Sequence, residues 1–173
     1  HLKFVFSDVR LDPRTANPWL VLSEDGRRVQ DGNVEHKVPD LPERFDTAPC
    51  VLALTGFTTG RHYWEVDVGD KTAWDLGVAR KSVTRKGVVV LSPEEGYWAI
   101  CLRRGREYRA CAEQAQLLYL PQRPQVIGLF LDYEEGTVSF YDAHTAHCFT
   151  GGRICLNGRQ EKVSLLCFYS VSG

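Results

Sequence analysis

Short runs in which hydrophobic and polar residues alternate occur along much of the chain, and they predict an all-β fold. In the run 61–69 the alternation places Tyr63 on one face of a strand and Trp64 on the other. A second run, 74–79, follows a glycine-containing turn, so we expect the two runs to pair as a hairpin. Trp64 and Trp74, one in each run, are expected to fill the interior of the fold.

Turn-forming residue pairs recur about every eight to twelve residues, which is the spacing typical of an antiparallel sandwich. The runs 126–133 and 137–141 are separated by a short turn that contains Gly136, and they predict a hairpin. The best helical candidate is 112–120, but prolines follow it directly. We interpret this segment as a loop or a single turn.

Composition narrows the class of protein. The chain has 173 residues, 43% of them hydrophobic, which suits one domain, 1–173, with a sizeable core. A formal charge of −1 gives no overall attraction to nucleic acid or to an anionic membrane. We expect no signal peptide in the first residues. Because the sequence contains no methionine, we also expect it to begin inside a longer protein.

The six cysteines form no Cys-x-x-Cys pair, and most lie in apolar runs. Free cysteine packs as a small hydrophobic residue, so we expect reduced core thiols and a cytoplasmic location. One segment contains four residues of the types that bind zinc, His144, His147, Cys148 and Cys155. Their spacing matches no zinc finger, and we expect solvent-exposed loop histidines and no metal.

No arrangement of residues predicts catalysis. The serines lack a Gly-x-Ser-x-Gly elbow, and no glycine-rich phosphate loop is present. Two pairs of adjacent glutamates precede glycines. We interpret them as solvated charges in turns and not as the paired carboxylates of a glycosidase. His62 reads as a structural histidine at the start of a strand, with a pH switch as the alternative. We therefore expect a domain that is not itself an enzyme and that needs no cofactor.

Three segments resemble the PRY-SPRY, or B30.2, domain of the tripartite-motif and butyrophilin proteins. Residues 9–25 match the opening pattern LDPxTANPxLxLSED, and residues 126–141 match LDYexGxvSFY. The stretch from Pro42 to Val78, which includes the alternating run 61–69, is similar to the family core. The resemblance implies a bent antiparallel β-sandwich, a concanavalin-like jelly roll.

The resemblance also implies how the domain is divided, with a PRY segment at 1–46 and a SPRY segment at 47–173. We expect the proline-containing segment 37–47 to cross between these parts without splitting the core. The chain departs from the family pattern in 148–160, and 161–169 reads as its penultimate strand. We expect the final strand of the pattern to be lacking, which would leave a sheet edge or a gap.

Members of the family bind partners through loops at one end of the sandwich. Basic residues with aromatic neighbours are common anchors of protein interfaces, although solvated hairpin tips would explain the same charges. On the partner-binding interpretation the recognition face contains Asp75, Arg80, Lys81, Arg85, Tyr97, Trp98, Arg103, Arg104, Arg106 and His144.

Such a face predicts a target protein or peptide with an acidic group or a free carboxylate. The resemblance implies the substrate-recognition domain of a tripartite-motif E3 ubiquitin ligase, whose RING lies elsewhere and whose coiled coil could make the parent dimeric. The alternative is a butyrophilin-type sensor of a phosphorylated small ligand, although Asp75 would repel phosphate. A lectin-like sugar binder ranks last. Members that bind antibody Fc carry tryptophans where this chain has Cys101 and Arg103, which argues against Fc binding.

Overall fold

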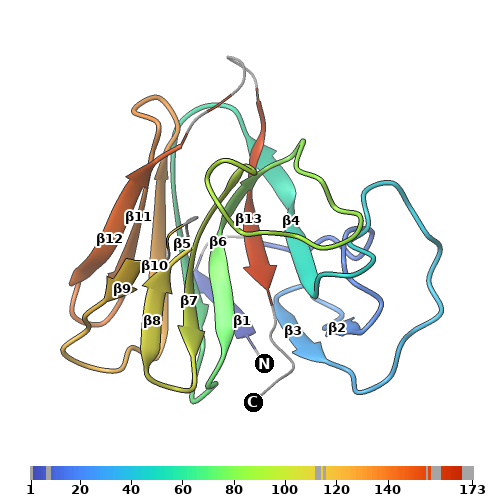
Figure 1. The fold of residues 1–173 in the computed structure, drawn as a ribbon, viewed down its shortest axis with the longest axis horizontal. Helices are drawn as coiled ribbons and strands as arrows, with labels where there is room; N and C mark the ends of the chain where they lie inside the picture. The colour runs from blue at the N-terminus through green and yellow to red at the C-terminus, as the bar shows by residue number, and fades with distance from the viewer. Residues whose placement is uncertain are drawn as a thin grey trace.

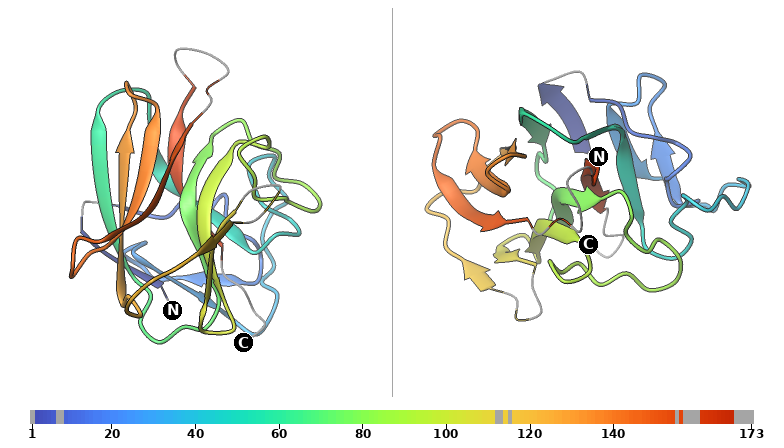
Figure 2. Two further views of the ribbon diagram at one scale, coloured as in Figure 1. Left: turned by 60° about the vertical axis from the view of Figure 1, so that its left-hand side comes forward. Right: turned by 90° about the horizontal axis from the view of Figure 1, so that it is seen from above.

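The computed structural model describes residues 2–6, 9–111, 114, 116–154, 156 and 161–168. Its strands form two antiparallel sheets that pack face to face, and the left panel of Figure 2 separates the two layers. No helix of the described residues could cross a membrane. The predicted all-β sandwich is confirmed.

The first sheet has seven strands in the order β12-β11-β10-β5-β1-β3-β2 (Figure 1). Their bounds are β1 Leu2–Phe6, β2 Leu20–Leu22, β3 Arg28–Asp31, β5 Arg61–Asp67, β10 Val126–Asp132, β11 Thr137–Asp142 and β12 Cys148–Arg153. The predicted hairpin of 126–133 and 137–141 is confirmed, since β10 and β11 pair in register from Ile127 with Asp142 to Asp132 with Thr137.

The second sheet has six strands in the order β4-β13-β6-β7-β8-β9. Their bounds are β4 Cys50–Phe57, β6 Trp74–Arg80, β7 Tyr97–Arg103, β8 Glu107–Ala110, β9 Gln116–Leu118 and β13 Val163–Phe168. The chain therefore forms a short strand within 112–120, where we expected a loop or a single turn. β13 lies inside the sheet, because it hydrogen-bonds to β4 on one side and to β6 on the other.

The hairpin predicted between 61–69 and 74–79 is wrong. β5 pairs with β10 and β1 in the first sheet, whereas β6 pairs with β7 and β13 in the second. The turn at 69–73 is a corner that carries the chain from one sheet to the other. A hairpin and a corner share the same local turn residues, so the alternating pattern could not separate them.

The core lies between the two sheets and contains the inward residues of both. Trp64 on β5 is 3% exposed and Trp74 on β6 is fully buried, so the prediction that both fill the interior is confirmed. Trp64 lies opposite Leu129 on β10, which is also fully buried. Because neighbours along a strand face opposite ways, Asp75 and Cys101 must point outward, away from this core.

A smaller core covers part of the outer face of the second sheet. Phe45, from the connection between β3 and β4, packs with Cys50, Ala79 and Tyr97 and is fully buried. The connection at 32–49 is the long loop at the right of Figure 1. It lies outside the sandwich and leaves the main core undivided, as we expected of 37–47.

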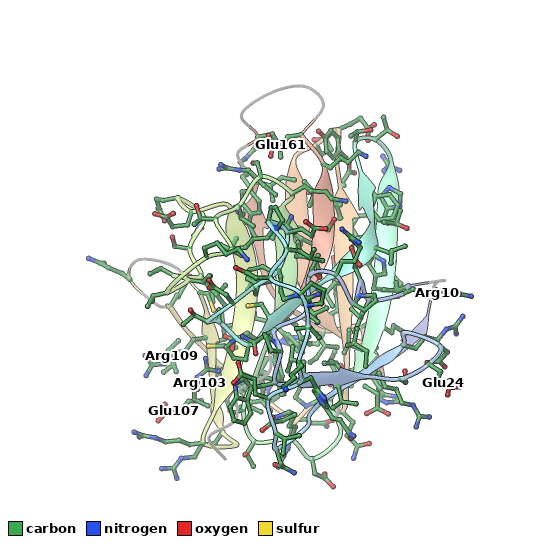
Figure 3. All side chains as sticks on the ribbon, turned by 90° about the vertical axis from the view of Figure 1, so that its right-hand side faces the viewer. Arg10, Glu24, Arg103, Glu107, Arg109 and Glu161 are labelled. Atoms are coloured by element: carbon green, nitrogen blue, oxygen red, sulfur yellow. The ribbon has the colours of Figure 1, made fainter. Side chains whose placement is uncertain are left out.

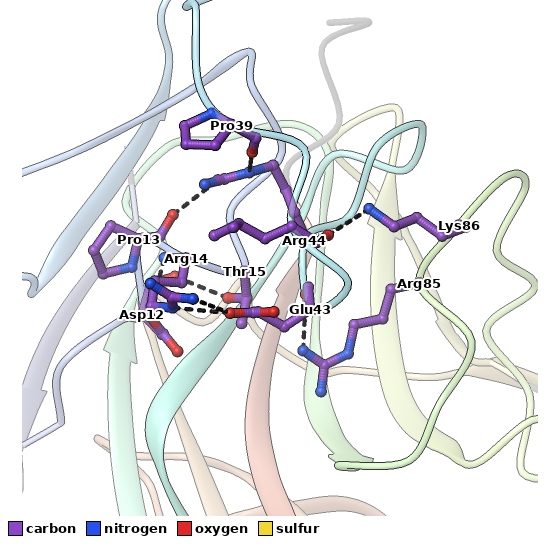
Figure 4. Close-up of polar contacts among 10 residues, drawn as sticks. Asp12, Pro13, Arg14, Thr15, Pro39, Glu43, Arg44, Arg85 and Lys86 are labelled. Atoms are coloured by element: carbon purple, nitrogen blue, oxygen red, sulfur yellow. Dashed lines mark hydrogen bonds and ion pairs between the residues drawn. The ribbon is translucent and has the colours of Figure 1, made fainter.

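Arg44 holds this connection in place. Its buried guanidinium donates to three backbone carbonyls, those of Pro39 at 2.8 Å, Pro13 at 2.9 Å and Ala16 at 2.8 Å. Figure 4 shows the contacts with the two prolines. One side chain therefore ties the N-terminal segment to the loop that covers the second sheet.

A candidate partner-binding face

The outer face of β6, β7 and β8 brings several polar side chains together. Asp75 on β6 lies directly opposite Cys101 on β7, and Cys101 lies opposite Arg109 on β8. Arg103, two residues after Cys101, shares the same face. These residues come from separate parts of the sequence, and only the strand register shows that they are neighbours.

Asp75 and Arg103 form an ion pair at the rim of this face. The Nη2 atom of Arg103 lies 3.1 Å and 3.0 Å from the two carboxylate oxygens of Asp75. Asp75 is 1% exposed, whereas the Arg103 side chain is 39% exposed. Burial raises the pKa of Asp75 to about 6, and the neighbouring Arg103 opposes that rise.

Two thiols lie beside this pair. The Sγ atom of Cys111 is 3.8 Å from the Oδ1 atom of Asp75, and Cys111 continues the β7–β8 ladder through its bond to Ala99 O. A hydrogen bond from Cys111 lowers the pKa of the Cys101 thiol. The same bond, together with burial, raises the pKa of Cys111.

The turn after β7 adds exposed cations. We call Arg103, Arg104, Arg106 and Arg109 the basic rim. Glu107 lies 3.7 Å from both Arg104 and Arg109, and those two arginine side chains are 77% and 44% exposed. Figure 3 shows Arg103, Glu107 and Arg109 gathered at one end of the molecule, far from Glu161.

The other predicted basic cluster lies at the opposite end of the same strands. Ala79 pairs with Tyr97, and Trp74 pairs with Leu102, so Arg80 and Arg103 are at opposite ends of the β6–β7 pair. Six residues of strand separate the two ends, a span of about 20 Å. Arg80 and Lys81 therefore do not share one pocket with the basic rim.

Besides Asp75, three predicted site residues are buried, and the prediction that these three line the recognition face is corrected. Arg85 is 7% exposed and donates to the carbonyls of Glu43 at 2.8 Å and Lys81 at 2.7 Å. Tyr97 is 2% exposed and its hydroxyl donates to Thr84 O at 3.0 Å. Trp98 faces the main core at 4% exposure. All three stabilise the fold, and none is placed to touch a partner.

The histidines lie apart from this face. His144 is exposed in the turn between β11 and β12, where its backbone N–H donates to Asp142 at 2.9 Å. His62 stacks on Phe57 with ring centroids 3.6 Å apart, which supports the structural interpretation. Within the described part of the chain, His144, His147 and Cys148 do not group closely enough to hold a metal ion. Cys155 lies outside the described residues.

A second surface feature occurs on the outer face of the first sheet. Tyr63, Phe130 and Tyr141 line an open hollow of about 330 Å³ next to the β11–β12 turn. The register explains the grouping, because Tyr63 lies opposite Phe130 and Tyr141 lies opposite Gly128. This aromatic group could not be predicted from the sequence, because its residues come from three strands.

These features define a β-sandwich that offers loops and one sheet face to other molecules, on a rigid two-sheet support. The chain belongs to the SPRY domain family. The SPRY domain model matches residues 61–154, and the model of PRY, the SPRY-associated domain, matches residues 9–57. The resemblance noted in the sequence is therefore confirmed.

Several curated proteins are similar to this chain. E3 ubiquitin-protein ligase TRIM58 of Mus musculus is 54% identical over 78% of this chain and 28% of its own length. E3 ubiquitin-protein ligase TRIM68 of Homo sapiens is 48% identical over 91% of this chain and 33% of its own length. Erythroid membrane-associated protein of Homo sapiens is 49% identical over 84% of this chain and 31% of its own length. The chain thus spans about a third or less of each.

Solved structures agree on the fold. The TRIM65 PSpry domain superposes with a TM-score of 0.78 at 21% identity, covering 95% of this chain and 86% of that one. A stonustoxin structure superposes with a TM-score of 0.84 at 25% identity, covering 96% of this chain and 27% of that one. Both likenesses support the sandwich architecture.

Proposed function

We propose that this chain is a non-catalytic module that recognises a target protein or peptide through the outer face of β6–β8 and the basic rim. The observation that carries the proposal is the Arg103–Asp75 pair, which fixes one guanidinium at the end of β7 beside the exposed Arg104 and Arg106. A preorganised cation loses little side-chain entropy on binding, which favours its use in recognition.

The charge of the rim indicates the chemistry of the partner. Its four arginines outnumber the two carboxylates among them, Asp75 and Glu107. Arginine pairs well with carboxylates because its planar fork matches their geometry. We therefore propose a target segment that carries acidic side chains or a free C-terminal carboxylate.

The relatives suggest a setting for this module. TRIM58 and TRIM68 are named E3 ubiquitin-protein ligases, and this chain matches about a third or less of each. We propose that the module selects the substrate of such a ligase in the cytoplasm, with catalysis residing in another part of the parent protein. Dimerisation of the parent through a coiled coil would raise affinity through avidity.

The test is a comparison of matched charge reversals. Reversal of Arg103 would leave Asp75 buried beside a second carboxylate, so the clean variant is Arg104→Glu combined with Arg106→Glu. Lys81→Glu, in the exposed cluster at the opposite end, is the control. Proteins captured from cytosol would be identified by mass spectrometry, and binding of each captured protein would be measured with purified components.

We expect at least one direct partner to bind the Lys81 variant normally and the double variant more than about tenfold more weakly, since each lost charged contact costs about 1.5–3 kcal/mol. Equal binding by both variants would reject this placement of the site. Calorimetry with inorganic pyrophosphate tests the alternative, a sensor of a phosphorylated small ligand. A module that binds only a protein or peptide should give no heat of binding with pyrophosphate.

A further inference from the structure

The outer face of the second sheet holds a cluster of three potential metal ligands. Asp75, Cys101 and Cys111 come from β6, β7 and the residue after β8, with Cys101 directly opposite Asp75 and Cys111 diagonally across from Cys101. One ligand atom from each lies within 4.8 Å of the others. Asp75 is 1% and Cys101 7% exposed, while Cys111 is partly open to solvent.

The spacing of these atoms suits a tetrahedral zinc ion. Zinc bonds of about 2.3 Å to sulfur and about 2.0 Å to oxygen place tetrahedral ligand atoms about 3.5–3.8 Å apart. The distance between Cys111 Sγ and Asp75 Oδ1 is 3.8 Å. Small side-chain rotations within the 4.8 Å cluster would bring all three to one centre.

The charges also suit a thiophilic dication. Two protons leave the thiols when the metal binds, and the two thiolates then balance the two charges of the ion. Arg103 already balances Asp75, and it can keep one carboxylate oxygen while the other binds metal. The exchange of two protons for Zn²⁺ therefore leaves the net charge of the buried cluster unchanged.

Oxidation to a disulfide fits the pair less well. Cys101 pairs with Arg109, so Cys111 is its diagonal neighbour across the β7–β8 ladder. Diagonal neighbours lie about 7–8 Å apart, which is beyond the usual Cα separation of a disulfide, about 4.4–6.8 Å. Two thiolates that share a metal ion can span this distance without a shift of the backbone.

We propose that Asp75, Cys101 and Cys111 form a zinc site, with the fourth coordination position open on the proposed partner-binding face. The side chain of Arg103 hydrogen-bonds to the Asp75 carboxylate and orients it, as partners of metal-binding carboxylates do. An ion here would join three strands of the second sheet at the edge of the basic rim. The site is independent of partner identity, since it uses only this chain.

The experiment is a titration of the reduced, metal-free chain with Co²⁺, followed by competition with Zn²⁺. Thiolate ligands give Co²⁺ an intense near-ultraviolet charge-transfer band. Cys101→Ser and Cys111→Ser each remove one ligand, and Cys148→Ser, at an exposed thiol outside the cluster, is the matched control. Circular dichroism would confirm that each variant is folded.

We expect one equivalent of Co²⁺ to bind in the wild type and the Cys148 variant, with the band displaced by Zn²⁺. Binding should weaken more than about tenfold in each of the other variants, since even outer partners of a metal site contribute tenfold or more. Absence of the band in the wild type, or its loss in the Cys148 variant alone, would overturn the proposal.

A second readout protects the test against poor folding of one variant. Zinc should raise the thermal midpoint of the wild type, and chelation should reverse the rise, because a ligand of the native state stabilises it. An unchanged midpoint at saturating zinc would also overturn the site. Neither readout involves a protein partner, so failure here would leave the proposed recognition function untouched.

Discussion

Replacement of Arg44 by methionine tests how the N-terminal segment is attached. Methionine keeps an unbranched apolar side chain of similar reach but removes the guanidinium. Three backbone carbonyls, those of Pro13, Ala16 and Pro39, then lose their donor. The side chain is 5% exposed, so water can replace those bonds only if the local structure opens.

The expected cost follows from these three bonds. An unsatisfied buried acceptor costs about 1–3 kcal/mol, and three carbonyls lose their donor here. Because local relaxation lets water reach some of them, we expect Arg44→Met to lower the free energy of unfolding by the lower part of this sum, about 3–5 kcal/mol. For a chain of this length, each kcal/mol shifts the thermal midpoint by about 2–4 °C, which predicts a fall of about 6–20 °C.

Arg14→Met is the matched control, because Arg14 also lies in this network but is largely exposed. It contacts Glu43 at 2.7 Å with 63% of its side chain exposed, and an exposed ion pair contributes about 0–1 kcal/mol. Urea unfolding followed by tryptophan fluorescence would give both free energies. If Arg44→Met costs less than 1 kcal/mol or no more than Arg14→Met, the assignment of Arg44 as the anchor is refuted.

Three further substitutions test local packing, two of them in the second sheet and one, the control, in β12 of the first. Gly77→Ala should prevent folding or greatly lower the yield of soluble protein, because a Cβ atom there would lie 2.0 Å from the backbone oxygen of Trp98. Gly152→Ala, where nothing lies within 4 Å of the added Cβ, should leave the thermal midpoint nearly unchanged, and equal behaviour of the two variants would contradict the packing argument. Tyr97→Phe should lower the free energy of unfolding in urea by about 1 kcal/mol, because the hydrogen bond to Thr84 O is lost. An unchanged free energy would show that this hydrogen bond does not stabilise the fold.

The strands and their inward faces could be predicted from the sequence because alternation is a local property. Trp64 and Trp74 are buried as the pattern indicated. Apart from the β10–β11 hairpin, the strand partners could not be predicted in the same way. The turn between Val68 and Trp74 has the residues of a hairpin, yet the chain changes sheets there, and this choice depends on β10 and β7, which are distant in sequence.

The candidate site shows the same limit. Arg85 and Arg103 both occur in basic clusters of similar composition, so the sequence indicated one recognition face for both. Their environments differ because their partners are distant in sequence. Arg85 donates a hydrogen bond to the carbonyl of Glu43 in the covering loop, whereas Arg103 forms an ion pair with Asp75 near the start of β6. Neither contact involves residues close enough in sequence to produce a motif.

The Asp75–Arg103 pair changes the argument about ligand class. From the sequence, the carboxylate of Asp75 counted against a phosphorylated ligand because like charges repel. In the structure Arg103 offsets that charge at 3.0 Å, so the field at the rim is set by Arg104, Arg106 and Arg109 together with Glu107, which lies 3.7 Å from Arg104 and from Arg109. Charge alone therefore admits either a carboxylate or a phosphate, and shape must decide between them. The rim lies at one end of β7 and β8 and in the turn between them, where Arg104 and Arg106 are exposed, whereas a small phosphorylated molecule binds well only when a pocket encloses most of its surface. The exposure of these arginines is the reason that we propose an acidic segment of a protein, and not a small phosphorylated ligand, as the partner.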